Sequence, residues 1–333
     1  MPKKILIAVL CCAVAVAVAA AVFVMPQFEK SENTDFLMNT VVNARLEGKG
    51  SEETAKRIIN RISELENNCF SRTEEDSDIY RLNKEYSANL SEETKSVLLK
   101  ALEVCEKSSG AFDITLAAVS DLWNESGQSK ALPDSGNLQK AVEASGFEKL
   151  SINGDNATLQ TGAGVDLGSV GKGAACDYAR ELLEETEVSR AVVSVGGSIL
   201  LYGEGDFTVG IASPEKGSSD YIATLTLPSG CVSTSGTYER YFDLGEKRYH
   251  HILDSQTGYP VDNGLVSVTV CSQDGLLSDA LSTACFVLGI EEGMKLALDY
   301  GCQAVFVTDN GEIHTTDGLE NLIDVTDSGY TLV

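Results

Sequence analysis

The sequence predicts an α+β fold in which mixed and antiparallel sheets are flanked by helices. Amphipathic helical patterns dominate the first half of the chain, and short alternating strands separated by turns dominate the second half. The chain has 333 residues, of which 43% are hydrophobic and 23% charged, as in a soluble protein with a proper core. A formal net charge of −25 argues against nucleic acid or anionic lipid as a partner.

An uncharged apolar stretch, residues 5–24, follows Lys3 and Lys4 at the start of the chain. About 20 apolar residues match the hydrocarbon thickness of a bilayer, and basic residues on the N-terminal side favour a cytoplasmic location for that end. We therefore expect residues 1–30 to form a single-pass anchor and linker in the cell membrane, with residues 31–333 folded outside the cytoplasm. A cleaved signal peptide is disfavoured because its apolar region is usually about 7–15 residues long.

The nine cysteines give no sign of a metal site, since none forms a C-x-x-C pair or lies at zinc spacing from a histidine. A lipoprotein signal at Cys11 or Cys12 is disfavoured because little apolar sequence precedes them. The other seven lie mostly in apolar surroundings, which predicts that they are buried as small hydrophobic residues. These are Cys69, Cys105, Cys176, Cys231, Cys271, Cys285 and Cys302.

The first elements of the folded part follow from local spacing and capping signals. Residues 25–35 are interpreted as a polar linker, and residues 36–48 are predicted to form a strand. Apolar residues at helical spacing predict a helix over 52–67, with Ser51 as its cap. Those apolar residues are Ala55, Ile58, Ile59, Ile62 and Leu65.

The same signals continue toward the middle of the chain. Ser91 is expected to cap a helix over 91–107 that Gly110 ends. After it, in order, we predict helices over 116–124 and 136–146, a hairpin about an Asn-Gly-Asp turn over 149–161, and a glycine-rich loop that runs into a helix over 164–185.

The C-terminal half alternates between strands and turns, which predicts antiparallel sheet. A buried strand broken by a glycine pair covers 189–203, and further strands fall within 207–214, 221–230, 231–236, 240–254 and 266–272. Ser278 is expected to cap a helix that Gly289 closes. A helix over 291–301 and a hairpin over 302–316 complete the prediction.

The string "DLGSVGKGAACD", residues 166–177, has glycines at Gly168, Gly171 and Gly173 where a helix begins. Free N–H groups at a helix start attract phosphate, and Lys172 adds a positive charge in a very acidic chain. The spacing fits neither the Walker A motif nor the G-x-G-x-x-G turn. A loop that only allows close packing of a strand on a helix is the alternative.

Two oxygen ligands lie one helical turn apart in "SDALSTAC". Asp279 and Thr283 are four residues apart, so they share one helix face. A carboxylate and a hydroxyl group are hard ligands that suit Mg²⁺, which keeps water or substrate phosphates as its other ligands. Alternatively, Asp279 only stabilises the start of its own helix and Thr283 packs inside.

The bend "HHILDSQTGYP", residues 250–260, holds two of the three histidines of the chain. His251 is a candidate for a general base, a phosphate donor or a structural hydrogen-bonding group, and Asp254 is a candidate to orient it. His250 points to the opposite face of a strand and is expected to be structural.

The string "SGAFDIT", residues 109–115, is predicted to be a strand after a helix. Phe112 lies between small residues, where its ring could stack on a flat ligand. Asp113 could accept a hydrogen bond from an amino group of the same ligand.

Taken in order, these motifs resemble those of the ApbE family of FAD:protein FMN transferases, from about residue 36 to the C-terminus. Asn39 stands where the family usually has Gly, and Ala174 stands where Tyr is common. The strings that carry the resemblance are "MNT" (38–40), "SDIYRLN" (77–83), "GAFDIT" (110–115), "VDLGSVGKGAACD" (165–177), "VSVGGSIL" (193–200), "STSGTYERYF" (233–242), "RYHHILDSQTGYP" (248–260) and "SDALSTACFVLG" (278–289).

The resemblance implies an ApbE-like fold that binds FAD as its substrate between the helix-rich and sheet-rich parts. It implies that Mg²⁺ is held by Asp279, Thr283 and the carbonyl of Gly171. The residues implied to contact FAD are Met38, Ala111, Phe112, Asp113, Gly168, Lys172, Ala174 and Leu253.

The resemblance also implies a reaction. A Ser or Thr hydroxyl group of an acceptor flavoprotein, expected to be a membrane-associated electron-transfer protein, attacks the FMN-side phosphorus of FAD, and AMP leaves. His251 is the candidate to take the hydroxyl proton, with Asp254 orienting it. Two alternatives remain open: an Mg²⁺-dependent FAD pyrophosphatase that uses the same site with water, and a non-catalytic FAD-binding membrane protein.

Overall fold

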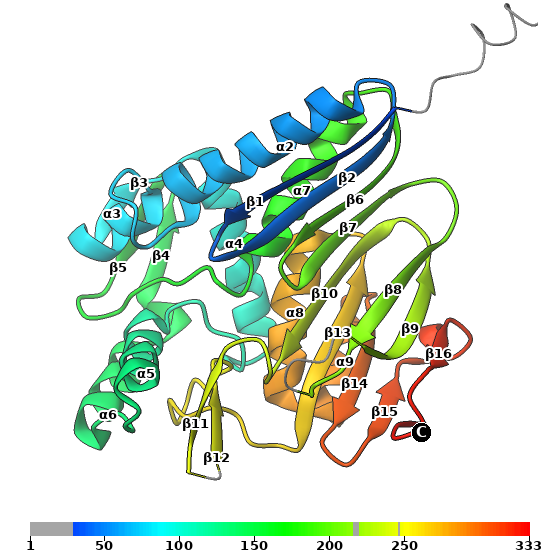
Figure 1. Cartoon of the computed structure of the whole chain (residues 1–333). Coiled ribbons are helices and arrows are strands. Elements are labelled where there is room, and N and C mark those ends of the chain that lie inside the picture. The colour runs from blue at the N-terminus through cyan, green and yellow to red at the C-terminus, as the bar shows by residue number, and fades with distance from the viewer. Residues whose placement is uncertain (1–28, 216–219, 246) are drawn as a thin grey trace, which may run out of the picture.

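The structure is a computed structural model that describes residues 29–215, 220–245 and 247–333. The expected membrane anchor, residues 5–24, lies outside these ranges. Within them, no helix is both long and apolar enough to cross a bilayer. The described chain has the expected α+β architecture, in which a large sheet packs against helices (Figure 1).

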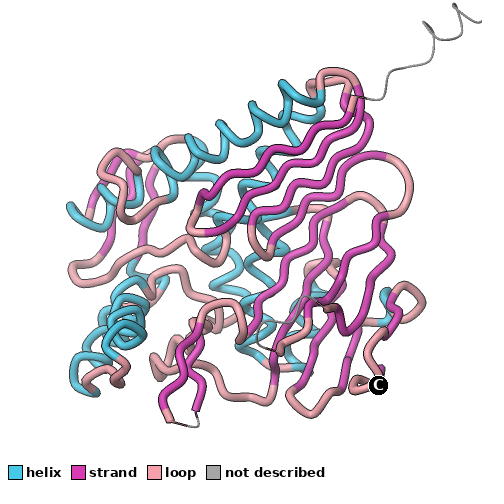
Figure 2. The backbone as a smooth tube through the Cα atoms, in the orientation of Figure 1, coloured by secondary structure: helices cyan, strands magenta, loops and turns pink. Residues whose placement is uncertain are grey.

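A nine-stranded sheet runs through the molecule (Figure 2). Neighbouring strands are antiparallel except β15 and β17, which are parallel, so the sheet is mixed as expected. In spatial order its strands are β1 (Lys30–Leu37), β2 (Thr40–Gly48), β6 (Val188–Val195), β7 (Ser198–Gly203), β10 (Gly230–Gly236), β13 (Leu265–Ser272), β14 (Gln303–Thr308), β15 (Glu312–Thr315) and β17 (Thr331–Leu332).

Three smaller sheets surround the large one. The first is β16 (Ile323–Val325), β9 (Tyr221–Leu227) and β8 (Phe207–Ala212); the second is β3 (Ser87–Asn89), β5 (Asn156–Leu159) and β4 (Leu150–Asn153); the third is the hairpin of β11 (Tyr241–Leu244) and β12 (Lys247–His250). The predicted hairpin over 149–161 is confirmed by β4 and β5, which pair with Asn153 opposite Asn156.

Most helices lie in the first half of the chain, and two more, α8 and α9, lie near its C-terminal end, as the sequence predicted. They are α2 (Ser51–Leu65), α3 (Asp78–Glu85), α4 (Glu92–Lys107), α5 (Ala117–Ser129), α6 (Ser135–Ala144), α7 (Gly171–Glu184), α8 (Gly275–Leu288) and α9 (Ile290–Asp299). Within the described ranges the structure also has one π-helical turn (Glu66–Phe70) and two 3₁₀ turns (Phe147–Lys149 and Asp317–Leu319).

Successive side chains of a strand point to opposite faces of the sheet, and both faces are buried at its central strands. At the edge, the side chains of β1 are exposed or half-buried. On β7, Leu200 packs with the core under α2 and α7, whereas Leu201 packs against the three-stranded sheet of β8, β9 and β16. On β14, Phe306 faces the helices and Val307 faces that small sheet. Burial of alternate residues on two different cores fixes the register of each strand.

The cysteines within the described residues are free thiols, as the apolar surroundings suggested. All except Cys271 are buried, and Cys271 is partly buried. They pack as small hydrophobic residues, which confirms the prediction for the described part of the chain.

Two predictions near the start of the described chain were wrong. Residues 30–35 are not a linker, because β1 begins at Lys30 and pairs with β2. Residues 36–48 are not one strand, because Met38 and Asn39 form a two-residue turn with φ angles of 51° and 56°. A two-residue hairpin turn requires these left-handed conformations, which Asn tolerates well, so Asn39 can replace the usual Gly.

Three further details differ from prediction. The first helix has Gly50 rather than Ser51 as its cap, and α8 begins a turn early, with Asp274 rather than Ser278 accepting the cap hydrogen bond. The predicted strand at 109–115 is absent among the described elements, because Asp113 draws the backbone N–H of Thr115 into a turn. The cap at Ser91 is confirmed, since its hydroxyl accepts from the N–H of Thr94.

An aromatic cluster holds the helix-rich part against the bend at 250–260. Trp123 on α5 stacks on Tyr249, with ring centroids 5.5 Å apart, and contacts Phe242 at 6.2 Å. Its indole N–H donates to the carbonyl of Gly258 at 2.6 Å. The cluster therefore combines apolar burial with one buried hydrogen bond.

Truncation of this cluster is expected to destabilise the fold. Trp123→Ala removes a side chain that is 6% exposed, so we expect the free energy of unfolding to fall by about 3–5 kcal/mol. Urea denaturation followed by circular dichroism measures the change. The control is Leu132→Ala, since Leu132 is 46% exposed and its loss should change stability by less than about 0.5 kcal/mol. Equal midpoints for the two variants would show that the cluster contributes little.

Candidate active site

The structure brings the glycine-rich loop and the helix with Asp279 into direct contact. The N–H of Gly173 on α7 donates to Oδ2 of Asp279 on α8 at 2.9 Å. Lys172 Nζ lies 3.5 Å from Oδ1 of the same carboxylate and donates to the carbonyl of Gly168 at 2.6 Å. The motif with Gly173 and the motif with Asp279 therefore form one site, although these two residues are 106 positions apart in the sequence.

Asp279 does not stabilise the start of its own helix, which was the alternative interpretation. α8 begins four residues earlier, and Asp274 accepts from the N–H of Leu277 as its cap. The carboxylate of Asp279 is buried, with 4% of its side chain exposed, and it faces the first turn of α7. A buried carboxylate requires such partners because burial of an unpaired charge is costly.

The first turn of α7 has fewer free N–H groups than the loop sequence suggested. The N–H of Gly171 donates to the carbonyl of Leu167 at 2.7 Å, and that of Gly173 is taken by Asp279. A phosphate group at this place would be bound by the cation of Lys172 more than by a cradle of these two backbone groups.

Thr283 lies one turn after Asp279, as predicted, and is half-buried. Its hydroxyl is 3.1 Å from the hydroxyl of Ser235 on β10, so the helix is tied to the large sheet at this position. The described residues contain no group of three His, Cys, Asp or Glu side chains that could hold a metal ion. A cation here would depend on Asp279, neutral oxygens and the phosphates of a bound ligand.

Glu239 and Arg240 belong to the site, although the sequence did not single them out. Together with Lys172, His251 and Asp279 they form what we call the charged cluster. Desolvation by the surrounding protein raises the pKa of Glu239, Lys172 and Arg240 oppose the rise, and Asp279 adds to it. The sequence signal was the pair of charges inside "STSGTYERYF", an otherwise neutral string.

The glycine pair after β6 makes room for this cluster. A Cβ atom on Gly197 would lie 2.9 Å from Oε1 of Glu239 and 2.8 Å from the carbonyl of Thr234. Only glycine therefore lets the carboxylate lie against the backbone here. The glycine pair of the "VSVGGSIL" string thus leaves the space that the side chain of Glu239 occupies.

His251 is held by Arg240. Its backbone N–H donates to the carbonyl of Arg240 at 3.1 Å, and its ring Nδ1 is 3.2 Å from the same oxygen. Because a carbonyl only accepts, Nδ1 carries the proton, and Nε2 of the neutral ring keeps its lone pair. The guanidinium of Arg240 in turn donates to the carbonyl of Asn39 at 3.3 Å, which joins the hairpin turn to the site.

The surroundings of His251 favour the neutral ring. The residue is exposed at the surface, yet the protein around it is dense, and desolvation lowers its pKa to about 3, with the charges of Arg240 and Lys172 contributing. The imidazole is therefore neutral at pH 7 and able to accept a hydrogen bond or a proton at Nε2.

Asp254 does not orient His251 in this structure. Its Oδ1 accepts from the N–H groups of Gln256 and Thr257, at 2.7 and 3.0 Å. These bonds shape the turn of the 250–260 bend. His250 is structural as expected: it is buried, and its Nε2 lies 2.9 Å from the carbonyl of Val261.

The 109–115 string contacts the same bend, since the hydroxyl of Ser255 donates to the carbonyl of Gly110 at 2.6 Å. However, Phe112 is 1% exposed and packs in the main core, so its ring does not face a ligand in this structure. Asp113 accepts from the N–H groups of Thr115 and Phe147, and desolvation raises its pKa. The backbone around Ala111, which is half-buried, is the part of the string available to a ligand.

The remaining predicted contact residues are distributed around this region. Met38 forms the hairpin turn and packs on both helix-side cores, and Gly168 is exposed. Ala174 and Leu253 are buried, at 2% and 7% exposed, so their side chains support the loop and the bend from inside. An open hollow of about 280 Å³ lies beside the loop that precedes α7, and it is lined by Arg72, Thr73, Asn83, Ala117, Ala118, Asp121, Gly162, Ala163 and Gly164.

Comparison with known proteins agrees with the motifs. The model of the ApbE family matches residues 38–306. An FAD:protein FMN transferase of Klebsiella pneumoniae (strain 342) is 34% identical over 227 residues, which are 67% of this chain and 71% of the relative. One from Escherichia coli (strain K12) is 30% identical over 285 residues, which are 81% of each chain. The crystal structure of the ApbE protein from Thermotoga maritima superposes with a TM-score of 0.80 at 30% identity and covers 88% of this chain and 99% of that chain.

The neutral state of His251 can be tested by proton NMR, because the chain has only three histidines. We expect the ring resonance of His251 to show no inflection between about pH 5 and pH 8, where an ordinary histidine titrates. His251→Gln identifies the resonance by its loss. An inflection near the ordinary pKa of about 6.5 would contradict the proposed environment of the ring.

Proposed function

The chain belongs to the ApbE family, and on this premise we propose that it is an FAD:protein FMN transferase. It transfers FMN from FAD to a Ser or Thr hydroxyl group of an acceptor protein and releases AMP. The observation that carries the proposal is the meeting of Lys172, His251 and Asp279, which come from three separate motifs, in one charged cluster.

The cluster suits the diphosphate of FAD. Lys172 and Arg240 both lie close enough to His251 to depress its pKa, so their positive charges converge on one place. These two cations can pair with an anionic diphosphate, although Asp279 and Glu239 lie in the same cluster and the whole chain has a net charge of −25.

The residues also fit a divalent cation as cofactor. One oxygen of the Asp279 carboxylate accepts from the N–H of Gly173. The other oxygen lies 3.5 Å from Lys172 Nζ, which is too far for a strong hydrogen bond, so this oxygen can still bind a metal cation at a shorter distance. Asp279, the hydroxyl of Thr283 and the carbonyl of Gly171 would hold Mg²⁺ through hard oxygen ligands. When bound, Mg²⁺ neutralises charge on the diphosphate and on the departing AMP.

The proton of the acceptor hydroxyl group passes to His251. The hydroxyl oxygen forms a bond to the FMN-side phosphorus, the bond from that phosphorus to the AMP oxygen breaks, and Nε2 of the neutral ring accepts the proton. Bound diphosphate brings negative charge next to His251, which raises its pKa from the low value of the free site. The carbonyl of Arg240, rather than Asp254, holds the ring in the required tautomer.

The proposed transfer has a direct test. Incubation of the protein with FAD, Mg²⁺ and a flavin-acceptor domain is expected to add the mass of FMN to the acceptor and to produce AMP in equal amount. Mass spectrometry of the acceptor and chromatography of the nucleotides measure the two products. Free FMN and AMP with an unmodified acceptor would favour a pyrophosphatase.

Asp279→Ala is the matched variant in the same assay. The substitution removes the only carboxylate among the proposed Mg²⁺ ligands, so product formation should fall to background while FAD still binds weakly. Unchanged turnover would refute the assignment of Asp279 to the cation.

We further propose that residues 1–30 anchor the enzyme in the cell membrane, with the catalytic part outside the cytoplasm and a membrane-associated electron-transfer flavoprotein as acceptor. The support is the uncharged apolar stretch over 5–24 after Lys3 and Lys4. The full chain is expected to stay in the membrane fraction after alkaline carbonate extraction, whereas a chain that begins at residue 29 should be released. Release of the full chain would contradict the anchor.

A further inference from the structure

The starts of α7 and α8 carry the same five-residue pattern, G-x-x-x-D. It runs from Gly173 to Asp177 on α7 and from Gly275 to Asp279 on α8. The two glycines touch: a Cβ on Gly173 would lie 2.0 Å from the carbonyl oxygen of Gly275, and a Cβ on Gly275 would lie 2.4 Å from that of Gly173. The helices therefore meet backbone to backbone at this point.

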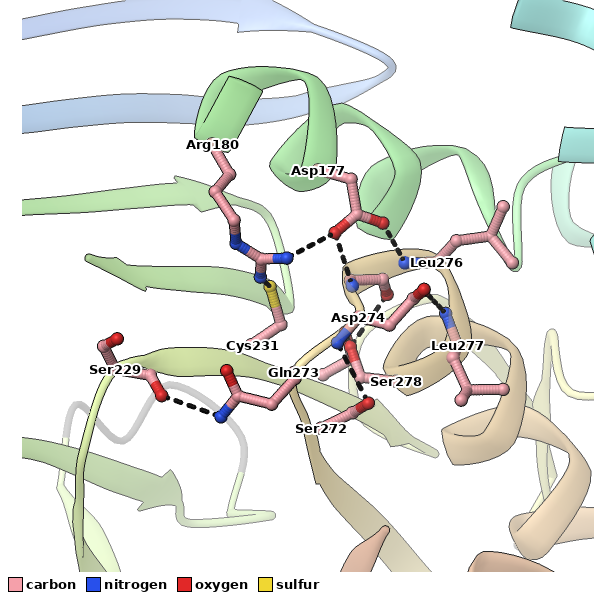
Figure 3. A network of polar contacts seen from close by, with 12 residues as sticks. Asp177, Arg180, Ser229, Cys231, Ser272, Gln273, Asp274, Leu276, Leu277 and Ser278 are labelled. Carbon is pink, nitrogen blue, oxygen red and sulfur yellow. Dashed lines mark hydrogen bonds and ion pairs between the residues drawn. The ribbon is translucent and has the colours of Figure 1, made fainter. Parts of the chain in front are cut away.

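Each aspartate accepts hydrogen bonds from the start of the other helix. Asp279 accepts from the N–H of Gly173 at 2.9 Å. In return, Asp177 accepts from the N–H of Gly275 at 2.7 Å and from that of Leu276 at 2.8 Å (Figure 3). The N–H groups in the first turn of a helix have no partner within the helix, and a carboxylate there is stabilised by the helix dipole. The two contacts form a reciprocal clamp.

The two aspartates differ in what else they face. Asp279 lies beside Lys172 in the charged cluster. Asp177 is 3.3 Å from the guanidinium of Arg180, which also contacts the thiol of Cys231 at 2.9 Å (Figure 3). Within the part of the chain that the structure describes, the hydrogen bonds of the Asp177 carboxylate run to α8 and to Arg180 on its own helix, and none of them reaches Lys172, Asp279 or Thr283.

We propose that Asp177 is a positioning residue, which sets where the carboxylate of Asp279 lies relative to Lys172 and Thr283 by holding the first turn of α8 against α7. This rests on the proposed function, since it assigns Asp279 to the cation that assists transfer. Asp279 follows Gly275 by about one helical turn, so a displaced helix start displaces Asp279 as well. From the sheet side, the hydroxyl of Ser278 is held 2.8 Å from that of Ser233. On the α7 side, the start of α8 is held by Asp177, and Asp279 itself bonds the N–H of Gly173.

The test compares Asp177→Asn with Asp274→Asn in the full chain. Asp274 also bonds the start of α8, through the N–H of Leu277, and pairs with Lys100, but among the described residues its side chain forms no hydrogen bond or ion pair with α7. Both variants weaken the capping of α8, and only Asp177→Asn loosens its link to α7. The probe is Mn²⁺ titrated in the presence of FAD, with free Mn²⁺ measured by electron paramagnetic resonance, beside thermal unfolding without metal.

We expect Asp177→Asn to weaken Mn²⁺ binding by about 10- to 100-fold, as when groups that orient a metal ligand are lost. Asp274→Asn should bind Mn²⁺ like the wild type, although its unfolding midpoint should decrease by about as much as that of Asp177→Asn. Saturating Mn²⁺ should restore most of the flavinylation rate of Asp177→Asn. Wild-type Mn²⁺ binding by Asp177→Asn, or equal weakening in both variants, would overturn the proposal.

A second variant guards against misfolding of the first. Asp177→Glu keeps the negative charge at the start of α8 and adds one methylene group at a tightly packed contact. It is expected to fold and to bind Mn²⁺ more weakly than the wild type, and unchanged binding would overturn the proposal. If the wild type binds Mn²⁺ with FAD but transfers no FMN to an acceptor, the proposed function fails while the comparison of variants still stands.

Discussion

The close contact between the starts of α7 and α8 is the constraint on which the site depends. A side chain at Gly173 or Gly275 would collide with the opposite backbone, so the two helices reach this distance only because both positions are glycine. The contact brings Lys172 and Asp279 to within 3.5 Å. It also lets a carboxylate from each helix satisfy N–H groups at the start of the other, which compensates for the burial of charge.

The site holds two cations beside two carboxylates in a chain that is strongly acidic as a whole. The protein has 50 acidic and 25 basic residues, yet Lys172 and Arg240 both act on His251 and depress its pKa. Solvent and salt screen charges that are more than about 8–10 Å apart, so the field at the site is set by these cations and the nearby carboxylates of Asp279 and Glu239, and not by the distant acidic surface. A neutral histidine beside two cations is an arrangement suited to an anionic substrate, whose binding restores the basicity of the ring.

The large sheet turns this local contact into a fixed frame. Its central strands are buried on both faces, so they cannot shift by one residue without exposing a core. The frame holds the hairpin turn at Asn39, the glycine pair at Gly197 and the strand with Ser235 around the start of α7. The helix-rich part shares its main core with α8, β13 and β14, and it is also attached by the hydrogen bond from Trp123 to Gly258 and that from Ser255 to Gly110.

The sequence by itself determined the α+β class and most helices and hairpins, because spacing, capping and charge are local properties of the chain, and it named Lys172, His251 and Asp279 as candidates for the site. Only the tertiary structure decided that Phe112 packs inside, that Asp254 shapes a turn, and that Glu239 and Arg240 join the site. Likewise, the sequence alone does not indicate that the two G-x-x-x-D segments contact each other. Their reciprocal hydrogen bonds are visible only in the structure, where the starts of α7 and α8 meet. The physical reason is that burial, hydrogen-bond partners and pKa values depend on which distant residues meet, and one-dimensional spacing does not contain those distances.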